Sequence, residues 1–124
     1  MSVDAEQGSA SEPQFAVTVD DRGDVAVVQM SGELDVYTAP ALRETLTEQI
    51  SGSANRVVVD LTGLSFMDST GLGVLLGTRK AAVAVSKSLA VVSVEGPVMR
   101  LISITGLEHV LQVFATVDEA VKPD

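Results

Sequence analysis

Short apolar runs alternate with helical segments along the chain, and this alternation constrains the fold most. The runs cover residues 25–30, 56–61 and 89–94, and the middle one reads RVVVDL. Strands that are almost continuous in apolar residues are typical of sheets covered on both faces, where helices connect parallel strands. The sequence therefore predicts an α/β fold whose mixed sheet is mostly parallel.

The first strands of this sheet are expected to form an antiparallel hairpin. Phe15, Val17 and Val19 alternate with polar or small residues, and the turn-forming segment 20–24 separates them from the run at 25–30. A loop is expected at 31–37 and a last strand at 110–114. The sheet would then have about five strands with one antiparallel edge.

The first helix is predicted to begin after Thr38, a plausible N-cap, with Pro40 in the first turn. Apolar residues repeat at helical spacing behind it, at Ala39, Leu42, Leu46 and Ile50. Another helix is expected to begin at Asp68 or Ser69 and to run past the basic pair 79–80. Its expected inner face is Leu72, Leu75, Leu76 and Val83, beside a strip of small residues at Gly73, Gly77, Ala81 and Ala84.

Two shorter helices are expected near the C-terminal end. Pro97 opens one of them, and Gly106 ends it. Thr116 and Glu119 have the spacing of a capping box, which predicts a terminal helix. The whole chain would then contain about four helices.

Length and composition limit the domain organisation. The chain has 124 residues and a net charge of 8 − 17 = −9. Residues 1–13 are small, polar and acidic and are predicted to be a disordered tail, while residues 14–124 are predicted to form one domain. The absence of cysteine excludes disulfides and thiolate chemistry.

The charge also bears on partners and location. An excess of carboxylates disfavours binding to nucleic acids and to anionic membranes. The polar, acidic start does not resemble a signal peptide, and no apolar stretch approaches the ~18 residues of a membrane span. The sequence therefore predicts a cytoplasmic protein with no nucleic-acid or membrane partner.

In open α/β sheets, ligands and partners bind where strands end and helices begin. The segments 31–38 and 64–73 qualify, and they carry Glu33, Asp35 and Asp68. Phe66 and Met67 are expected to anchor the second segment to the core. Ser69 would then lie at a helix start, where free backbone N–H groups could hold a phosphate attached to it. The structural alternative is that Asp68 or Ser69 is only a helix cap.

Glycines inside the second helix cost roughly 1 kcal/mol each relative to alanine and need a reason. For Gly71 and Gly73 we expect that reason to be the close approach of a partner to Ser69. For Gly77 we expect close packing of the helix on the sheet.

No catalytic, metal or cofactor site emerges from the remaining residues. The single histidine, His109, supports neither a catalytic triad nor a metal site. The segment 71–77 resembles a dinucleotide fingerprint with the wrong last spacing. Asp60 ends an apolar run like the phosphoacceptor of a receiver domain, but a receiver has a helix where residues 25–30 predict a strand.

The pair of motifs GELD at 32–35 and LSFMDSTGLG at 64–73 resembles bacterial anti-sigma factor antagonists, which are single-domain STAS proteins. The resemblance covers about residues 14–120 and implies the STAS fold. It implies that Ser69 is phosphorylated by a cognate anti-sigma factor, a serine kinase with a histidine-kinase-like ATP-binding fold. A metal-dependent serine phosphatase resets the switch in that family.

By this resemblance the unphosphorylated protein binds the anti-sigma factor and so frees a sigma factor, with no catalysis of its own. The implied partner-binding residues are Glu33, Asp35, Asp68, Ser69, Thr70, Gly71 and Gly73, and Thr70 is a secondary candidate acceptor. Two alternatives stay open from the sequence: a receiver-like phosphoacceptor that uses Asp60, and a STAS interaction module without a switch.

Overall fold

The structure is a computed structural model that describes residues 14–122. A five-stranded sheet forms its centre. The strands lie in chain order: β1 (Ala16–Asp21), β2 (Val25–Leu34), β3 (Arg56–Met67), β4 (Ser88–Val92) and β5 (Gln112–Phe114). The pair β1 and β2 is antiparallel and every other pair is parallel. The predicted α/β class, the hairpin edge and the mostly parallel sheet are confirmed. The predicted tail at residues 1–13 lies outside the described residues.

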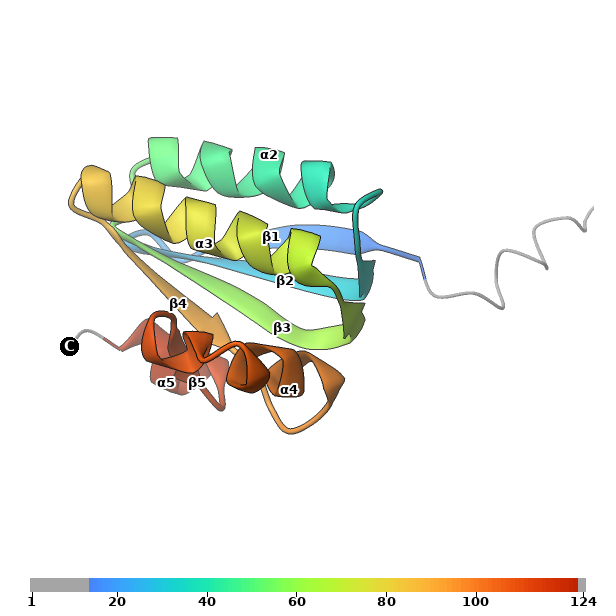
Figure 1. Cartoon of the computed structure of the whole chain (residues 1–124). Coiled ribbons are helices and arrows are strands. Elements are labelled where there is room, and N and C mark those ends of the chain that lie inside the picture. Colours follow the sequence, from blue (N-terminus) through green and yellow to red (C-terminus); the bar gives the residue numbers. More distant parts are fainter. Residues whose placement is uncertain (1–13, 123–124) are drawn as a thin grey trace, which may run out of the picture.

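Helices cover both faces of this sheet. The long helices α2 (Ala39–Ser51) and α3 (Ser69–Ala84) lie side by side on one face (Figure 1). The shorter helix α4 (Pro97–Ile104) packs against β3 and contributes to the same core. After α4 come a short 3₁₀ turn, η1 (Leu107–His109), and α5 (Val117–Val121). Ala120 of α5 packs on Val27 and Val58, on the opposite face from the main core. The four α-helices of residues 14–122 agree with the predicted number.

The central strands extend further than predicted. Segment 31–37 was expected to be a loop, but Ser31 to Leu34 continue β2, with alternating exposed and buried residues. Residues 62–67 likewise continue β3, so that Leu34 and Met67 are partners in the parallel ladder. Polar residues such as Ser31 and Ser65 occupy exposed positions of the strand ends, which breaks the apolar run without ending the strand.

Two other strands of the sheet, β4 and β5, are shorter than predicted at one end. β4 ends at Val92 rather than at residue 94, and β5 begins at Gln112 because the chain before it forms η1. The capping interaction of α5 is present, since the hydroxyl of Thr116 accepts from the amide of Glu119 at 3.1 Å. No helix within residues 14–122 is long and apolar enough to cross a membrane.

The buried face of α3 differs in part from the predicted one. Leu72 and Leu75 are buried as expected, but Val83 is 56% exposed. The other buried side chains of this helix are Val74, Thr78 and Ala82. The hydroxyl of Thr78 donates to the carbonyl of Val74 at 2.8 Å, and this bond satisfies it inside the core.

Candidate functional site

The sheet brings the two acidic motifs together. Leu34 ends β2 and Met67 ends β3, and these residues are register partners in neighbouring parallel strands. The amide of Asp68 donates to the carbonyl of Leu34 at 3.2 Å. Asp35 and Asp68 are the residues directly after this register pair. The two strands that they follow lie about 4.8 Å apart. The segments 31–38 and 64–73, which the sequence singles out, therefore meet at the carboxyl edge of the sheet.

The turn after β2 is held by its own side chains. One carboxylate oxygen of Asp35 accepts from the amides of Tyr37 at 2.9 Å and Thr38 at 3.1 Å. Thr38 occupies the N-cap position of α2, but its side chain makes no capping bond to that helix. Its hydroxyl instead accepts from the amide of Asp35 and donates to the carbonyl of Glu33, both at 2.9 Å. Thr38 is therefore the N-cap residue as predicted, but it makes no side-chain capping bond because the turn uses its hydroxyl.

Gly32 of the GELD motif has a structural role. Its φ angle is +95°, which strains any residue with a side chain. A Cβ there would lie 2.5 Å from the carbonyl oxygen of Gln14. This glycine lets β2 continue beneath the chain that enters β1, and Glu33 follows it on the exposed side of the strand.

Asp68 and Ser69 have different local roles. Asp68 is the N-cap of α3, and its Oδ1 accepts from the amides of Thr70 at 2.9 Å and Gly71 at 3.1 Å. Ser69 is the first residue of the helix and is exposed. No hydrogen bond to another described residue holds its hydroxyl. The capping requirement is thus met by Asp68, which leaves the Ser69 hydroxyl free to react.

Two backbone amides of the expected phosphate cradle are already occupied at this helix start. The amides of Thr70 and Gly71 donate to Asp68, so they are available to a phosphate on Ser69 only if this cap opens. Thr70 is half-buried whereas Ser69 is exposed, so Ser69 is the more accessible of the two hydroxyl residues.

Two of the three glycines of α3, Gly71 and Gly77, differ from their predicted roles. Gly71 is buried, and a Cβ there would lie 2.7 Å from Cγ and Cδ2 of Leu34. It packs the helix against β2 and offers no access to a partner. Gly73 and Gly77 are exposed, and a Cβ on either would meet nothing within 4 Å. Packing on the sheet therefore does not explain Gly77. Of the two glycines expected to let a partner approach, Gly71 and Gly73, only Gly73 is open.

Apolar side chains exposed near the motifs were missed by the sequence reasoning. Tyr37 is 88% exposed and Val36 is 56% exposed at the tip of the turn after Asp35. Phe66 was expected to anchor its segment to the core, but it is 44% exposed and pairs in register with Glu33. Of these two residues only Met67 is buried in the core. A tyrosine in a turn next to a motif was the available signal, because exposed aromatic residues often mark interfaces.

The receiver-like alternative is contradicted by the fold. Asp60 lies within β3 rather than at its end, and it is 8% exposed. Its Oδ1 accepts from the amide of Thr62 at 3.0 Å and from its hydroxyl at 2.7 Å. Residues 25–30 form a strand where a receiver has a helix. His109 is exposed in η1, and no group of three or more potential ligands for a metal occurs within residues 14–122.

The sheet order, the hairpin edge and the neighbouring strand ends define a small α/β domain with two acidic turns at the carboxyl edge of its sheet. The family model of the STAS domain matches residues 16–120. The chain is 43% identical to the anti-sigma-B factor antagonist of Staphylococcus aureus over 69% of this chain and 80% of that protein. The chain therefore belongs to the STAS family, among its anti-sigma factor antagonists.

Solved structures agree with this assignment. An anti-sigma factor antagonist from Mycobacterium paratuberculosis is 31% identical with a TM-score of 0.81, over 87% of this chain and 92% of that one. The antagonist SpoIIAA in its unphosphorylated form is 26% identical with a TM-score of 0.72, over 87% and 93%. SpoIIAA of Bacillus in its phosphorylated form is 27% identical with a TM-score of 0.66, over 87% and 96%.

Proposed function

We propose that this protein binds a cognate anti-sigma factor when Ser69 carries no phosphate, and that this binding frees a sigma factor. The observation that carries the proposal is the free, exposed hydroxyl of Ser69, directly after Asp68 at the edge where the two acidic turns lie on neighbouring strands. Support comes from the relatives, which are named as anti-sigma factor antagonists, and from SpoIIAA, which has a phosphorylated form. The proposed contact residues are Glu33, Asp35, Asp68, Ser69, Thr70 and Gly73, with Tyr37 and Phe66 added; Gly71 contributes only by packing.

The proposed switch is a phosphoryl transfer carried out by the partner. Ser69 Oγ attacks the γ-phosphorus of ATP, and the O–P bond forms as the bond from that phosphorus to the β-phosphate bridge oxygen breaks. ADP leaves, and the hydroxyl proton passes to a base of the kinase. The kinase is the anti-sigma factor itself, with a histidine-kinase-like ATP-binding fold. A metal-dependent serine phosphatase resets the switch by adding water across the phosphoester, which releases inorganic phosphate.

Charge and bulk at one position are sufficient to release the partner. A phosphate adds about −1.5 to −2 charges at pH 7. It would lie beside Asp68 and Asp35, on a surface that the partner must cover. This repulsion weakens binding because the partner displaces the water that screens it: two unit charges about 4 Å apart interact by about 1 kcal/mol in water and by about 4 kcal/mol at an effective dielectric constant of about 20. A loss of about 2.7 kcal/mol already weakens binding about a hundredfold.

Phosphopeptide mass spectrometry tests the proposal. The protein is incubated with the anti-sigma factor and ATP, and one phosphate is expected on Ser69. The Ser69→Ala protein should remain unmodified, while the Thr70→Ala protein should be modified like the wild type. Phosphate on the Ser69→Ala protein would overturn the assignment. Failure of any anti-sigma factor to modify a protein that it binds would favour a STAS module without a switch.

The proposed reaction places the protein in the cytoplasm, where ATP and the sigma factor are available. Its net charge of −9 disfavours nucleic acid and anionic membranes as partners. The protein itself would supply no catalytic group.

A further inference from the structure

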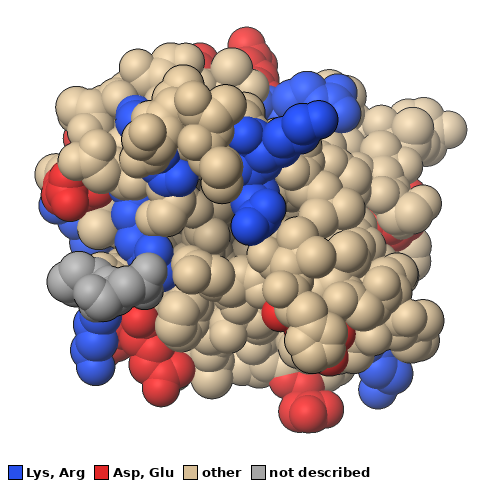
Figure 2. Space-filling model, turned by 60° about the vertical axis from the view of Figure 1, so that its left-hand side comes forward, with Lys and Arg blue, Asp and Glu red and all other residues tan. Residues whose placement is uncertain are grey.

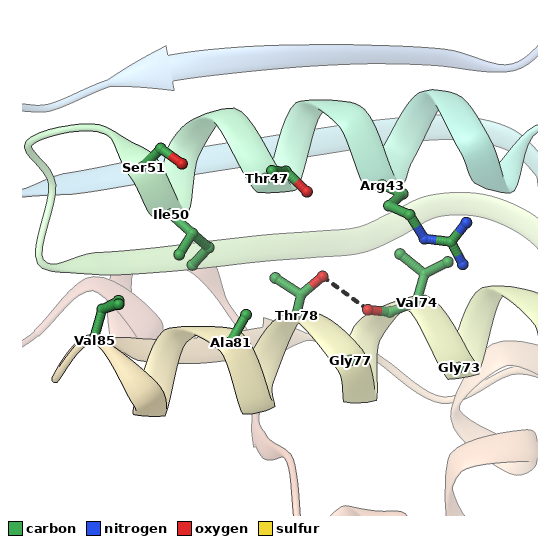
Figure 3. A pocket seen from close by; sticks show the side chains of 10 residues that line it. All are labelled: Arg43, Thr47, Ile50, Ser51, Gly73, Val74, Gly77, Thr78, Ala81 and Val85. Atoms are coloured by element: carbon green, nitrogen blue, oxygen red, sulfur yellow. Dashed lines mark hydrogen bonds between the residues drawn. The ribbon is translucent and has the colours of Figure 1, made fainter.

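A groove runs between α2 and α3 on the outer surface of the molecule. Its volume is about 440 Å³, which is within the size range of ligand sites. Ile50 of α2 and Val74 of α3 contribute its apolar floor (Figure 3). Gly73 and Gly77 form part of the α3 wall and have no side chains to close it. The groove is therefore open along α3 because of these glycines.

The glycines of this wall have no role in the protein's own packing. A Cβ on Gly73 or Gly77 would meet nothing within 4 Å. Each nevertheless costs the helix about 1 kcal/mol relative to alanine. No contact within the described residues offsets this cost, whereas the close approach of another molecule would.

The groove is continuous with the Ser69 site. Residues four apart on a helix lie one above the other on its surface, so Ser69, Gly73 and Gly77 form one row. Ser69 begins this row at the carboxyl edge of the sheet, and Ala81 ends it on the wall of the groove. A molecule that covers Ser69 thus meets the open row one helical turn further along.

The charge of the groove is opposite to that of the Ser69 site. Arg43 is the one charged residue in its lining, and its side chain points toward Val74 (Figure 3). Arg43 is exposed and forms no ion pair with another residue of the described range, where the only such pair joins Arg22 to Asp20. Figure 2 shows basic and acidic side chains interspersed on the face that it presents, although the protein is acidic overall. A partner segment that follows the row from Ser69 into the groove would come within reach of this unpaired guanidinium, which a carboxylate would complement.

We propose that the groove is a second contact surface for the anti-sigma factor, which places there an apolar segment with a carboxylate opposite Arg43. This inference rests on the proposed function and extends it from Ser69 along α3. A backbone or a small apolar side chain of the partner would lie against Gly73 and Gly77. The acidic edge and the Arg43 guanidinium would together favour one docking direction, because the reversed orientation would place the partner's carboxylate against Asp35 and Asp68.

Binding of the purified anti-sigma factor, measured by calorimetry, tests this surface. Gly77→Leu fills the open row and Arg43→Glu reverses the charge, and each should raise the Kd about tenfold or more. Arg43→Lys keeps the charge and should restore most of the affinity. The matched controls are Arg100→Glu and Ser103→Leu at exposed positions of α4, and both should bind like the wild type. Thermal melting establishes that every variant is folded.

The outcomes separate this inference from the proposed function. If the wild type binds and the groove variants bind equally well, the groove is not a contact surface and only the inference fails. If the wild type neither binds the anti-sigma factor nor is phosphorylated on Ser69, both fail. If the isolated wild type is a dimer and Gly77→Leu converts it to a monomer, the groove belongs to a second copy of the chain and the inference is overturned.

Discussion

The backbone amide of Asp68 donates to the carbonyl of Leu34 across 3.2 Å and so joins the end of β3 to the end of β2. This bond places the two acidic turns side by side, although they are far apart in the chain. Asp68 also caps α3, which leaves the next residue, Ser69, with a free hydroxyl. The proposed switch depends on this division of roles between adjacent residues.

Substitutions of Ser69 should separate charge from contact. Ser69→Ala removes a hydroxyl that forms no bond to another described residue, so affinity for the anti-sigma factor should stay within about threefold of wild type. Ser69→Asp adds a charge beside Asp68 and should weaken binding about tenfold or more. Surface plasmon resonance measures both. Full-strength binding by the Asp variant would count against the charge mechanism.

Substitutions of Asp68 should separate its capping role from its charge. Asp68→Ala removes the acceptor of two amides and should lower the free energy of unfolding by about 1 kcal/mol. Asp68→Asn retains the acceptor and should remain closer to the wild type. Urea denaturation measures the difference. Equal loss in both variants would show that charge, rather than the cap, stabilises the start of α3.

Three glycines of α3 should respond differently to alanine. Gly73→Ala and Gly77→Ala add a methyl group in open space and should each stabilise the fold by about 1 kcal/mol, or roughly 4 °C in Tm. Gly71→Ala places a methyl group against Leu34 and should destabilise it. Scanning calorimetry of the three variants measures this contrast. A lower Tm for Gly77→Ala would refute the open row.

Arg56 should be needed to hold α5 on the sheet. It is 7% exposed, its Nε donates to the carbonyl of Ala120 at 2.7 Å, and Nη1 donates to Ser88 at 3.0 Å. Its guanidinium carbon lies 5.9 Å from the centroid of the Phe114 ring. Arg56→Ala should cost about 2–3 kcal/mol of stability.

In the Arg56→Ala protein, hydrogen exchange should show that the backbone amides of α5 and β5 lose protection before those of the rest of the sheet. Arg100→Ala is the control, since Arg100 is exposed and its loss should change stability by less than about 0.5 kcal/mol. If Arg56→Ala opened every element equally, the local docking role would be wrong.

The sequence predicts elements well where burial is continuous. Runs such as residues 56–61 locate the central strands, and Pro40, Pro97 and Thr116 locate helix starts. The strand ends at Leu34 and Met67 were missed, because polar residues such as Ser31 and Ser65 interrupt the apolar runs before them. The exposure of Phe66 and Val83 also follows from tertiary packing rather than from spacing.

The site could be predicted only in part for the same reason. The motifs place Ser69 at a helix start, which the structure confirms as a position. Two neighbouring residues, Asp68 and Ser69, were candidates for the cap, and only geometry decides which one accepts the amides. The role of Gly71 depends on Leu34, a residue of another strand, and the groove at Gly77 exists only once α2 and α3 are packed together.

Tyr37 should contribute to partner binding through its exposed ring. It is 88% exposed beside Asp35, and the turn that carries it is held by hydrogen bonds to that carboxylate. Tyr37→Ala should weaken binding about tenfold while leaving the Tm unchanged, because the ring makes few contacts within the protein. Titration calorimetry with the anti-sigma factor, paired with thermal melting, measures both quantities. Unchanged affinity would place Tyr37 outside the interface.

The affinity of the anti-sigma factor for two forms of this protein tests the central claim most directly. One form is unmodified, and the other carries a single phosphate on Ser69, verified by mass spectrometry. The account predicts that the phosphorylated form binds about a hundredfold more weakly, and that a serine phosphatase restores the affinity. Equal affinity of the two forms would contradict the switch.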